Sequence, residues 1–299
     1  MANNKFIRSD LLLLTTAAIW GFAFVAQRTG MKFVGPFTFN AIRFLLGALV
    51  LIPIVLTRKN REKKIESSKL LSRYGCVVAG VVLFLGSSLQ QMGIVYTTAG
   101  KAGFITGLYL LIVPLMGLIW KQKIGWWGWI GVVLASLGLY LLSIKDNYTF
   151  APGDLMVLAA AFFWAAHVHI IDRLSKIKNP LKIAVKQYLI CSVLSLIVAY
   201  FREIIALDQI FRAGIPILYA GILSVGIAYT LQVIAQKKAP PSHAAIILSM
   251  ESVFALIGGT IILHEHLSLR GLLGCSLMFS GMILSQLNRT KKVKLLETF

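Results

Sequence analysis

A few side chains that could bind ions or exchange protons lie inside long apolar stretches of this sequence. Glu251 is the clearest case, because no other Asp, Glu, Lys or Arg occurs between Lys238 and Glu265. Ionisable groups in such surroundings are costly and usually face a cavity or a partner. Glu251 could therefore bind a cationic group or exchange a proton for a substrate. A hydrogen bond that only joins two helices is the alternative.

The stretch DLMVLAAAFFWAAHVHI (154–170) places His167 and His169 just after Trp164. Two residues along a helix turn through about 200°, so the two imidazoles cannot share a face, whereas Trp164 and His167 are neighbours. We expect His167 to face a cavity, and His169 to pack against a neighbour or to lie nearer the cytoplasmic interface. Because imidazole titrates near neutral pH, His167 joins Glu251 as a candidate for proton coupling. A polar contact between helices is the alternative.

Amide and phenol groups inside other apolar stretches could hold a zwitterionic or aromatic metabolite, or join helices to one another. Arg43, in AIRF, could attract an anion, reach toward the membrane interface or bond to helix carbonyls, and the structural interpretations are favoured. The three cysteines are isolated in apolar segments, which indicates neither disulfides nor a metal site. The predicted substrate-binding residues are Trp20, Phe24, Gln91, Tyr109, Trp164, His167, Tyr229, Gln232 and Glu251, and no cofactor or metal is expected.

The composition predicts an integral membrane protein. Hydrophobic residues make up 58% of the 299 residues and charged residues 14%, with a mean hydropathy of +0.79, whereas soluble domains carry about 25% charged residues. A membrane span needs about 20 mostly apolar residues. Ten segments meet this requirement: 10–29, 37–57, 75–97, 102–120, 126–144, 153–172, 183–201, 213–235, 242–263 and 271–288.

The basic residues predict the orientation of these spans. The Lys and Arg residues of alternate loops outnumber those of the opposite loops by about three to one, and the side rich in positive charge is normally cytoplasmic. We therefore expect both termini in the cytoplasm. The net charge of +19 is then mostly a consequence of topology. Because the charges are dispersed over many loops, no nucleic-acid partner is expected.

Parts of the sequence occur twice. Asp10 and Trp20 match Asp154 and Trp164 at one offset, while Ala23, the counterpart of His167, carries no imidazole. Further along, GWWGWIGVVLASLGLYLLS (125–143) resembles LRGLLGCSLMFSGMILSQ (269–286). We therefore predict an all-α integral membrane protein with ten transmembrane helices in two five-helix repeats, residues 1–148 and 149–299. Because five is odd, the second repeat must be inverted, an arrangement that recurs in secondary transporters with the substrate near mid-membrane.

The chain also resembles the ten-span EamA-type carriers of the drug/metabolite transporter superfamily. The resemblance rests on AAIWGFAFVAQ (17–27), AIRFLLGAL (41–49), YTTAGKAGFITGLYLLIVPL (96–115) and APPSHAAIILSMESVFALIGGTIILHEHLSLRGLLG (239–274). It implies a central cavity lined mainly by helices one, three, four, six, eight and nine. Two departures from the family pattern are visible. The family usually has Glu-Pro where this chain has Glu251-Ser252, which could alter the kink of helix nine. It also commonly has a Glu near the position of Gln122, a change expected to affect an interfacial contact and not transport.

Together these features predict a secondary transporter, not an enzyme, that moves a small metabolite across a bacterial cytoplasmic membrane by alternating access. Export of amino acids or related compounds is the leading interpretation, with coupling to protons left open. Uptake of a cofactor or an organic cation is the alternative. The expected partners are the substrate and the lipid bilayer, and the protein is expected to be a monomer or a weak homodimer.

Overall fold

The computed structural model describes residues 2–57, 69–97, 99–119, 125–143, 152–263 and 269–297, and every secondary-structure element within them is a helix. Eight helical stretches are long and apolar enough to cross a membrane, and Trp126–Leu141 and Leu272–Leu284 are two shorter apolar helices. These ten segments coincide with the ten predicted spans. The chain is therefore an all-helical membrane protein made of two repeats.

The first repeat contains α1 (Ala2–Gly30), α2 (Pro36–Thr57), α3 (Lys69–Tyr96), α4 (Ala99–Gly107), α5 (Tyr109–Ile119) and α6 (Trp126–Ser143). The second repeat contains α7 (Pro152–Ile177), α8 (Pro180–Arg202), α9 (Leu207–Arg212), α10 (Gly214–Leu218), the π-helix η1 (Tyr219–Tyr229), α11 (Thr230–Gln236), α12 (Pro241–Leu248), α13 (Glu251–Leu263) and α14 (Leu269–Glu297). Several helices begin at a proline, which has no N–H to leave unpaired in the first turn.

Side-chain contacts at the two ends of the bundle show that the repeats are inverted. At one end, Asp10 near the start of α1 contacts His243 at the start of α12, with 2.8 Å between Oδ1 and Nε2. At the other end, Asp154 at the start of α7 accepts a hydrogen bond of 2.5 Å from Thr97, just after α3. The three spans α1, α2 and α3 separate Asp10 from Thr97, so the two contacts lie at opposite ends of the bundle. The first helices of the two repeats therefore begin on opposite sides.

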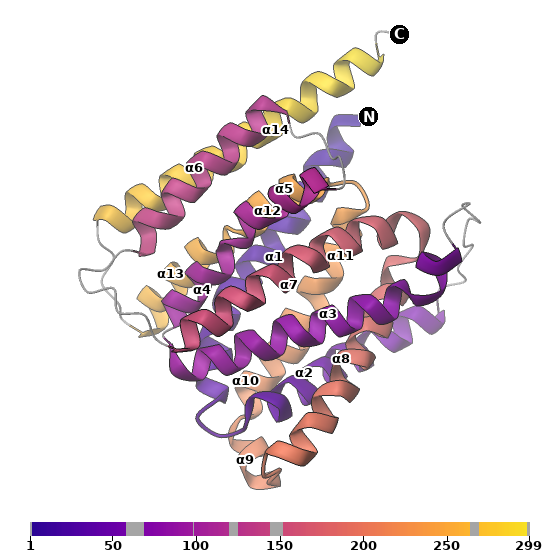
Figure 1. Cartoon of the computed structure of the whole chain (residues 1–299), viewed down its shortest axis with the longest axis vertical. Coiled ribbons are helices and arrows are strands. Elements are labelled where there is room, and N and C mark those ends of the chain that lie inside the picture. Colours follow the sequence, from indigo (N-terminus) through magenta and orange to yellow (C-terminus); the bar gives the residue numbers. More distant parts are fainter. Residues whose placement is uncertain are drawn as a thin grey trace.

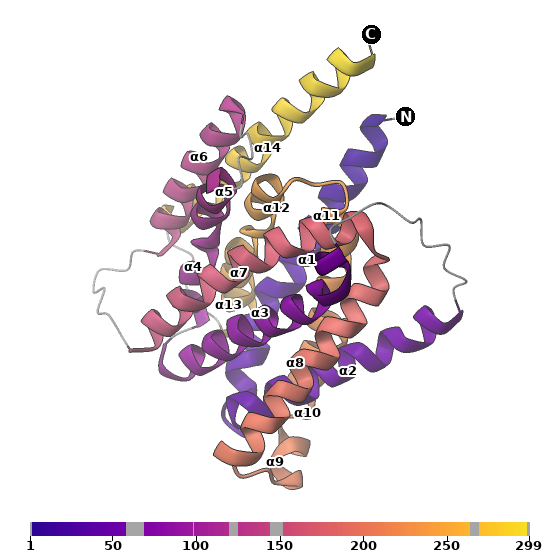
Figure 2. The same cartoon turned by 45° about the vertical axis from the view of Figure 1, so that its right-hand side comes forward.

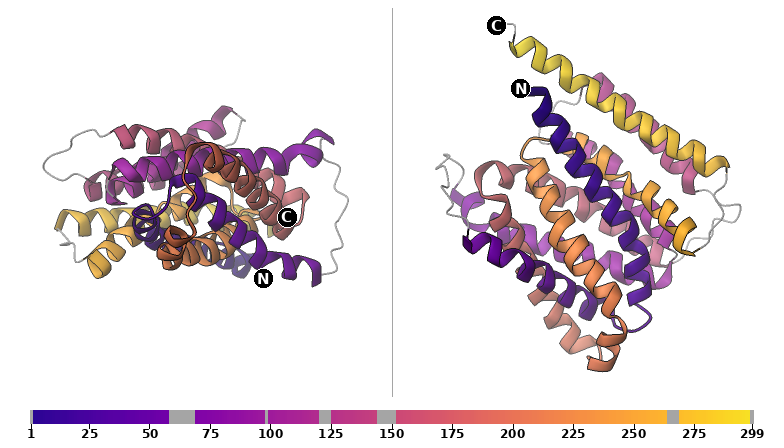
Figure 3. Two further views of the ribbon diagram at one scale, coloured as in Figure 1. Left: turned by 90° about the horizontal axis from the view of Figure 1, so that it is seen from below. Right: turned by 180° about the vertical axis from the view of Figure 1, so that it is seen from behind.

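The two repeats pack against each other through pairs of long helices. α2 packs against α8, α3 against α7, and α6 against α14, and the α6–α14 pair runs along one edge of the molecule (Figures 1 and 2). Glycines bring the backbones of this pair together: a Cβ on Gly138 would collide with the carbonyl oxygen of Gly274, and one on Gly281 with that of Gly131. Behind the bundle, α1 runs beside η1 and α11 (Figure 3).

The fourth span of each repeat is broken near its middle. The backbone of Leu108 separates α4 from α5, and Ser249 and Met250 separate α12 from α13. At both breaks the hydrogen bonds tighten to the 3₁₀ pattern, as in Leu111 N to Leu108 O at 2.9 Å and Val253 N to Met250 O at 3.0 Å. Pro114 lies inside α5, so the first break precedes this proline.

Candidate substrate-binding site

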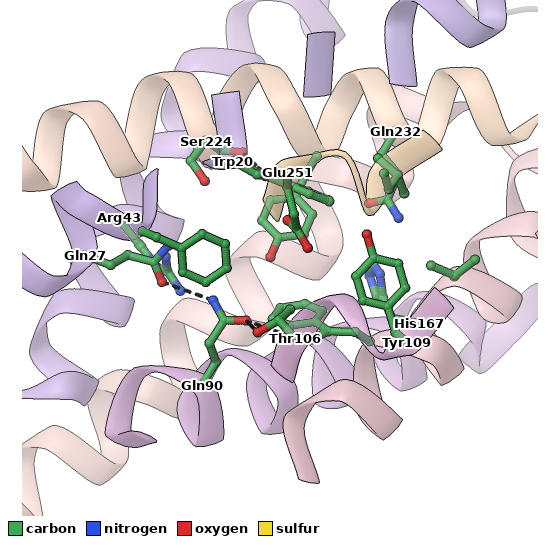
Figure 4. Close-up of a pocket in the computed structure, with 15 residues that line it drawn as sticks. Trp20, Gln27, Arg43, Gln90, Thr106, Tyr109, His167, Ser224, Gln232 and Glu251 are labelled. Atoms are coloured by element: carbon green, nitrogen blue, oxygen red, sulfur yellow. Dashed lines mark hydrogen bonds between the residues drawn. The ribbon is translucent and has the colours of Figure 1, made fainter. Parts of the chain in front are cut away.

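A small cavity with several polar side chains in its wall lies where the two broken spans meet α1, α2, α3, α7 and the η1–α11 helix (Figure 4). Its volume is about 40 Å³, which is room for a few water molecules. Both repeats contribute side chains to its wall. The lining residues are Trp20, Phe24, Gln27, Arg43, Gln90, Thr106, Tyr109, Trp164, His167, Val168, Ser224, Tyr229, Gln232, Leu248 and Glu251.

Aromatic rings form one wall of the cavity. The ring of Tyr229 lies between the two tryptophans that the repeat relates, with centroid distances of 4.6 Å to Trp20 and 6.1 Å to Trp164. Each indole N–H has an acceptor: Trp20 Nε1 donates to the carbonyl of Ser224 at 3.3 Å, and Trp164 Nε1 to Gln90 Oε1 at 2.8 Å. The rings are therefore fixed in orientation and offer π faces on which a cationic group could rest.

A small hydrogen-bond network surrounds the amide of Gln90. Its Oε1 accepts from Trp164 and, at 3.4 Å, from the hydroxyl of Thr106, while its Nε2 donates to Gln27 Oε1 at 3.3 Å. The network joins α1, α3, α4 and α7. It fixes the amides of Gln27 and Gln90 in the cavity wall by contacts that do not involve a substrate.

Two ionisable side chains complete the lining. Arg43 on α2 is only 2% exposed, and its guanidinium lies over the rings of Phe39 and Phe44, at 5.6 and 5.0 Å. Glu251 is the first residue of α13 and 3% exposed. Among the described residues neither forms an ion pair. Arg43 therefore does not reach the membrane interface, which was one expectation from the sequence.

Several buried polar atoms in the wall form no hydrogen bond within the described part of the chain. They are Tyr109 Oη, Gln232 Oε1, Glu251 Oε1 and Arg43 Nε. A buried polar atom without a partner costs about 1–3 kcal/mol, so a native protein normally has a use for it. Tyr109 and Glu251 interact with each other in the cavity, and a role of these four atoms in binding a polar solute stays a prediction.

The two histidines of α7 face different surroundings. His167 lines the cavity and its Nε2 lies 2.8 Å from Gln187 Oε1 on α8. His169 lies outside the lining, with its Nε2 2.8 Å from the carbonyl oxygen of Val113 on α5. Two residues along a helix turn through about 200°, which accounts for this difference. The contact with Gln187 also means that His167 already has a structural partner, and its role in proton coupling stays a prediction.

The cavity contains eight of the nine residues predicted to bind substrate, and their role in binding stays a prediction. The exception is Gln91, which points away and whose Nε2 contacts the carbonyl of Gln27 at 3.5 Å. Its neighbour Gln90 lines the wall instead, because consecutive helical residues lie about 100° apart. Sequence reasoning missed Gln27, although its spacing from Trp20 and Phe24 places the three on one helical face.

No group of three or more His, Cys, Asp or Glu side chains that could hold a metal ion occurs in the described segments. At the break before α13, the residue that follows Glu251 is a serine, not the proline that the family resemblance implies. Ser252 occupies that position, and its hydroxyl donates to the carbonyl of Gly103 at 3.0 Å. A helix-to-helix hydrogen bond thus occurs at this break. Gln122, the position of the other departure, lies outside the described residues.

Comparisons with known proteins agree with this architecture. The model of the EamA-like transporter family matches residues 7–144 and 151–287. A protein of Archaeoglobus fulgidus described as an uncharacterized transporter is 30% identical over 95% of this chain and 87% of its own length. The threonine/homoserine exporter RhtA of Escherichia coli (strain K12) is 26% identical, over 96% of this chain and 94% of its own.

The fold also has a counterpart among solved structures. One crystal structure superposes with a TM-score of 0.77 at 19% sequence identity, and the match covers 95% of this chain and 98% of the other. At this identity the likeness concerns the fold alone.

Proposed function

Because the chain belongs to the EamA-like transporter family, it is a multi-pass membrane transporter and not an enzyme, and we propose that it carries small zwitterionic metabolites by alternating access. Amino acids and related compounds are the proposed substrates, and export is the proposed direction. We place both termini in the cytoplasm, on the basis of the loop charges. Since the relatives come from archaea as well as bacteria, the proposal names a prokaryotic cytoplasmic membrane.

The observation that supports a zwitterion is the presence of Arg43 and Glu251 in one cavity without an ion pair between them. A guanidinium binds a carboxylate with strong, charge-assisted hydrogen bonds. A carboxylate beside aromatic rings suits an ammonium group. An amino acid presents both groups within a few ångströms of each other, so it could neutralise both buried charges at once.

Alternating access follows from the inverted repeats. Each repeat contributes a broken span to the cavity, and a break gives the two halves of a span freedom to tilt separately. The cavity of about 40 Å³ is smaller than an amino acid, so substrate must enter a conformation that is more open on one side. Exchange of conformations between the repeats would then open the other side.

Export is supported by the relative whose printed name is an exporter of threonine and homoserine. Coupling to protons is supported by Glu251, whose carboxyl is buried in the cavity and has an oxygen without a partner in the described chain. In this scheme Glu251 holds either a proton or the substrate ammonium group. Competition for one carboxylate would make the two fluxes opposite in direction.

The aromatic wall favours a second candidate, transport of an organic cation. Trp20, Trp164 and Tyr229 surround the region of Glu251 and could hold an ammonium group without any carboxylate. The two candidates differ in their use of Arg43. A cation has no need of it, whereas a zwitterion depends on it.

Flux in proteoliposomes tests the proposal. The full-length protein is offered a panel of amino acids, their decarboxylated amines and quaternary ammonium compounds, with and without an imposed pH gradient. Glu251→Gln is compared with Glu203→Gln, which makes the same chemical change at a carboxyl that caps the start of α2, outside the cavity. We expect gradient-driven flux of amino acids that Glu251→Gln loses and Glu203→Gln retains.

Three other results would change the proposal. Flux that ignores the pH gradient would leave a carrier but remove the proton coupling. Amine transport without amino-acid transport would favour the organic cation. Absence of flux for every amino acid, from protein that a thermal melt shows to be folded, would overturn the amino-acid class.

A further inference from the structure

A second hollow lies at the end of the bundle that carries the basic loops. It has a volume of about 430 Å³ and lies between α1, the start of α8 and the end of α11. It shares no lining residue with the central cavity, so it is a separate feature. The lining residues are Arg8, Ser9, Leu12, Asn179, Pro180, Leu181, Ile234, Ala235, Lys237 and Lys238.

The lining of the hollow combines basic and apolar side chains. Arg8, Lys237 and Lys238 are exposed at its mouth, and no Asp or Glu is among its lining residues. Within the described segments Arg8 and Lys237 form no ion pair. Leu12, Leu181 and Ile234 supply apolar surface, and Ile234 is 38% exposed on the outer face of the bundle. The hollow thus combines a positively charged mouth with a wall that borders the lipid.

We propose that this hollow binds the phosphate-bearing headgroup of an anionic phospholipid from the leaflet that faces the basic loops. Basic residues beside transmembrane helices on the cytoplasmic side attract anionic lipids, and the charge bias of the loops predicts that this end is cytoplasmic. The apolar side chains of the lining would receive the glycerol and the first acyl carbons. A soluble phosphate ester shares the phosphate chemistry but has no use for that apolar wall.

A bound headgroup would bridge the two repeats. Arg8 belongs to the first repeat, whereas Asn179 and Lys237 belong to the second. At the base of the hollow the hydroxyl of Ser9 donates to the carbonyl of Ala235 at 2.8 Å, so α1 and α11 are already in contact there. The lipid would add a second link and stabilise the conformation in which the basic ends of these helices are together.

Native mass spectrometry of the detergent-solubilised full chain tests this inference, with phosphatidylglycerol and phosphatidylcholine as probes. The double variant Arg8→Gln/Lys237→Gln is compared with Lys291→Gln/Lys292→Gln, which removes the same charge from the carboxyl-terminal segment. Each basic residue contributes about a 5-fold change in affinity for an anionic lipid. We expect one tightly held phosphatidylglycerol that the first variant binds about 25-fold more weakly and the second retains.

Three controls decide between explanations. The charge-retaining variant Arg8→Lys/Lys237→Arg should keep the lipid, which separates charge from folding. Displacement of the lipid by glycerol phosphate at equal concentration would show a site for soluble phosphate esters and overturn the lipid assignment. Equal retention of phosphatidylglycerol by both double variants, or equal binding of phosphatidylcholine, would also overturn it.

Discussion

Tyr109 and Glu251 occupy corresponding places in the two repeats: each is the first residue of the half-helix that follows the break in the fourth span. Both side chains line the cavity, where the hydroxyl of Tyr109 interacts with the carboxyl of Glu251. One repeat therefore presents a phenol and the other a carboxyl at the same structural point. The scaffold is duplicated, whereas the chemistry of the cavity is not.

Tyr109→Phe should weaken transport without destabilising the fold. The lost hydroxyl interacts with the Glu251 carboxyl but is not otherwise hydrogen-bonded within the described chain, so its removal costs the fold little, while a substrate would lose about 1 kcal/mol, or about 5-fold in apparent affinity. Tyr188→Phe is the matched control, because its hydroxyl lies 3.1 Å from that of Thr230. That variant should lower the melting temperature and leave affinity unchanged. The reverse pattern would remove Tyr109 from the binding surface.

Arg43→Gln should reduce affinity for amino acids by about 10-fold or more, since a hydrogen bond to a charged group contributes about 1.5–3 kcal/mol. Affinity for the corresponding amines should not change. Arg43→Lys keeps the charge but loses the bidentate geometry, so we expect an intermediate effect. Competition binding with paired amino acids and amines measures this. An equal loss for both members of each pair would mean that Arg43 only supports the fold.

Asp10→Asn and Asp154→Asn should open opposite sides of the protein. Asp10 holds α1 to α12 at the end with the basic loops, and Asp154 holds α7 to the end of α3 at the other. Ser224→Cys, in a background without the three native cysteines, reports access to the cavity. A membrane-impermeant thiol reagent should react several-fold faster from the basic side in Asp10→Asn and from the other side in Asp154→Asn.

Two results would contradict this gating scheme. The first is faster labelling from the same side in both variants, and the second is unchanged labelling in both. Asp10→Glu serves as the control, because it retains a carboxylate that can still reach His243. Its labelling should resemble that of the parent protein.

Gly138→Leu should destabilise the protein through the α6–α14 pair. A side chain there would meet the carbonyl oxygen of Gly274 and the Met278 side chain, and overpacking of this kind costs about 1–3 kcal/mol. A thermal melt in detergent should show a loss of several degrees. Leu137→Ala changes a half-exposed neighbour on the lipid side and should leave the melting temperature nearly unchanged. If Gly138→Leu melted at the same temperature as the parent protein, the close packing of α6 against α14 would not contribute to stability.

The amino-acid sequence by itself determined the class, the spans and the repeat. A long, continuously apolar segment can satisfy its backbone hydrogen bonds in a bilayer by forming a helix. Each repeat has an odd number of such spans, so the second repeat must be inverted. Helical spacing also placed His167 and His169 on different faces, because that relationship is local. For the same reason, Glu251 could be recognised as unusual from its neighbours alone.

Only the tertiary structure decided which polar groups meet. Gln90 and Gln91 are adjacent in sequence and equally polar, and the packing of α3 against α1 and α7 selects Gln90 for the cavity. Arg43 and Glu251 are far apart in the chain, and nothing local to either predicts that both face one space. The breaks at Leu108 and Ser249 likewise depend on neighbouring helices. Pro114 lies beyond the first break, and no proline lies at the second. Contacts between distant segments depend on how helices pack, and one sequence does not encode that locally.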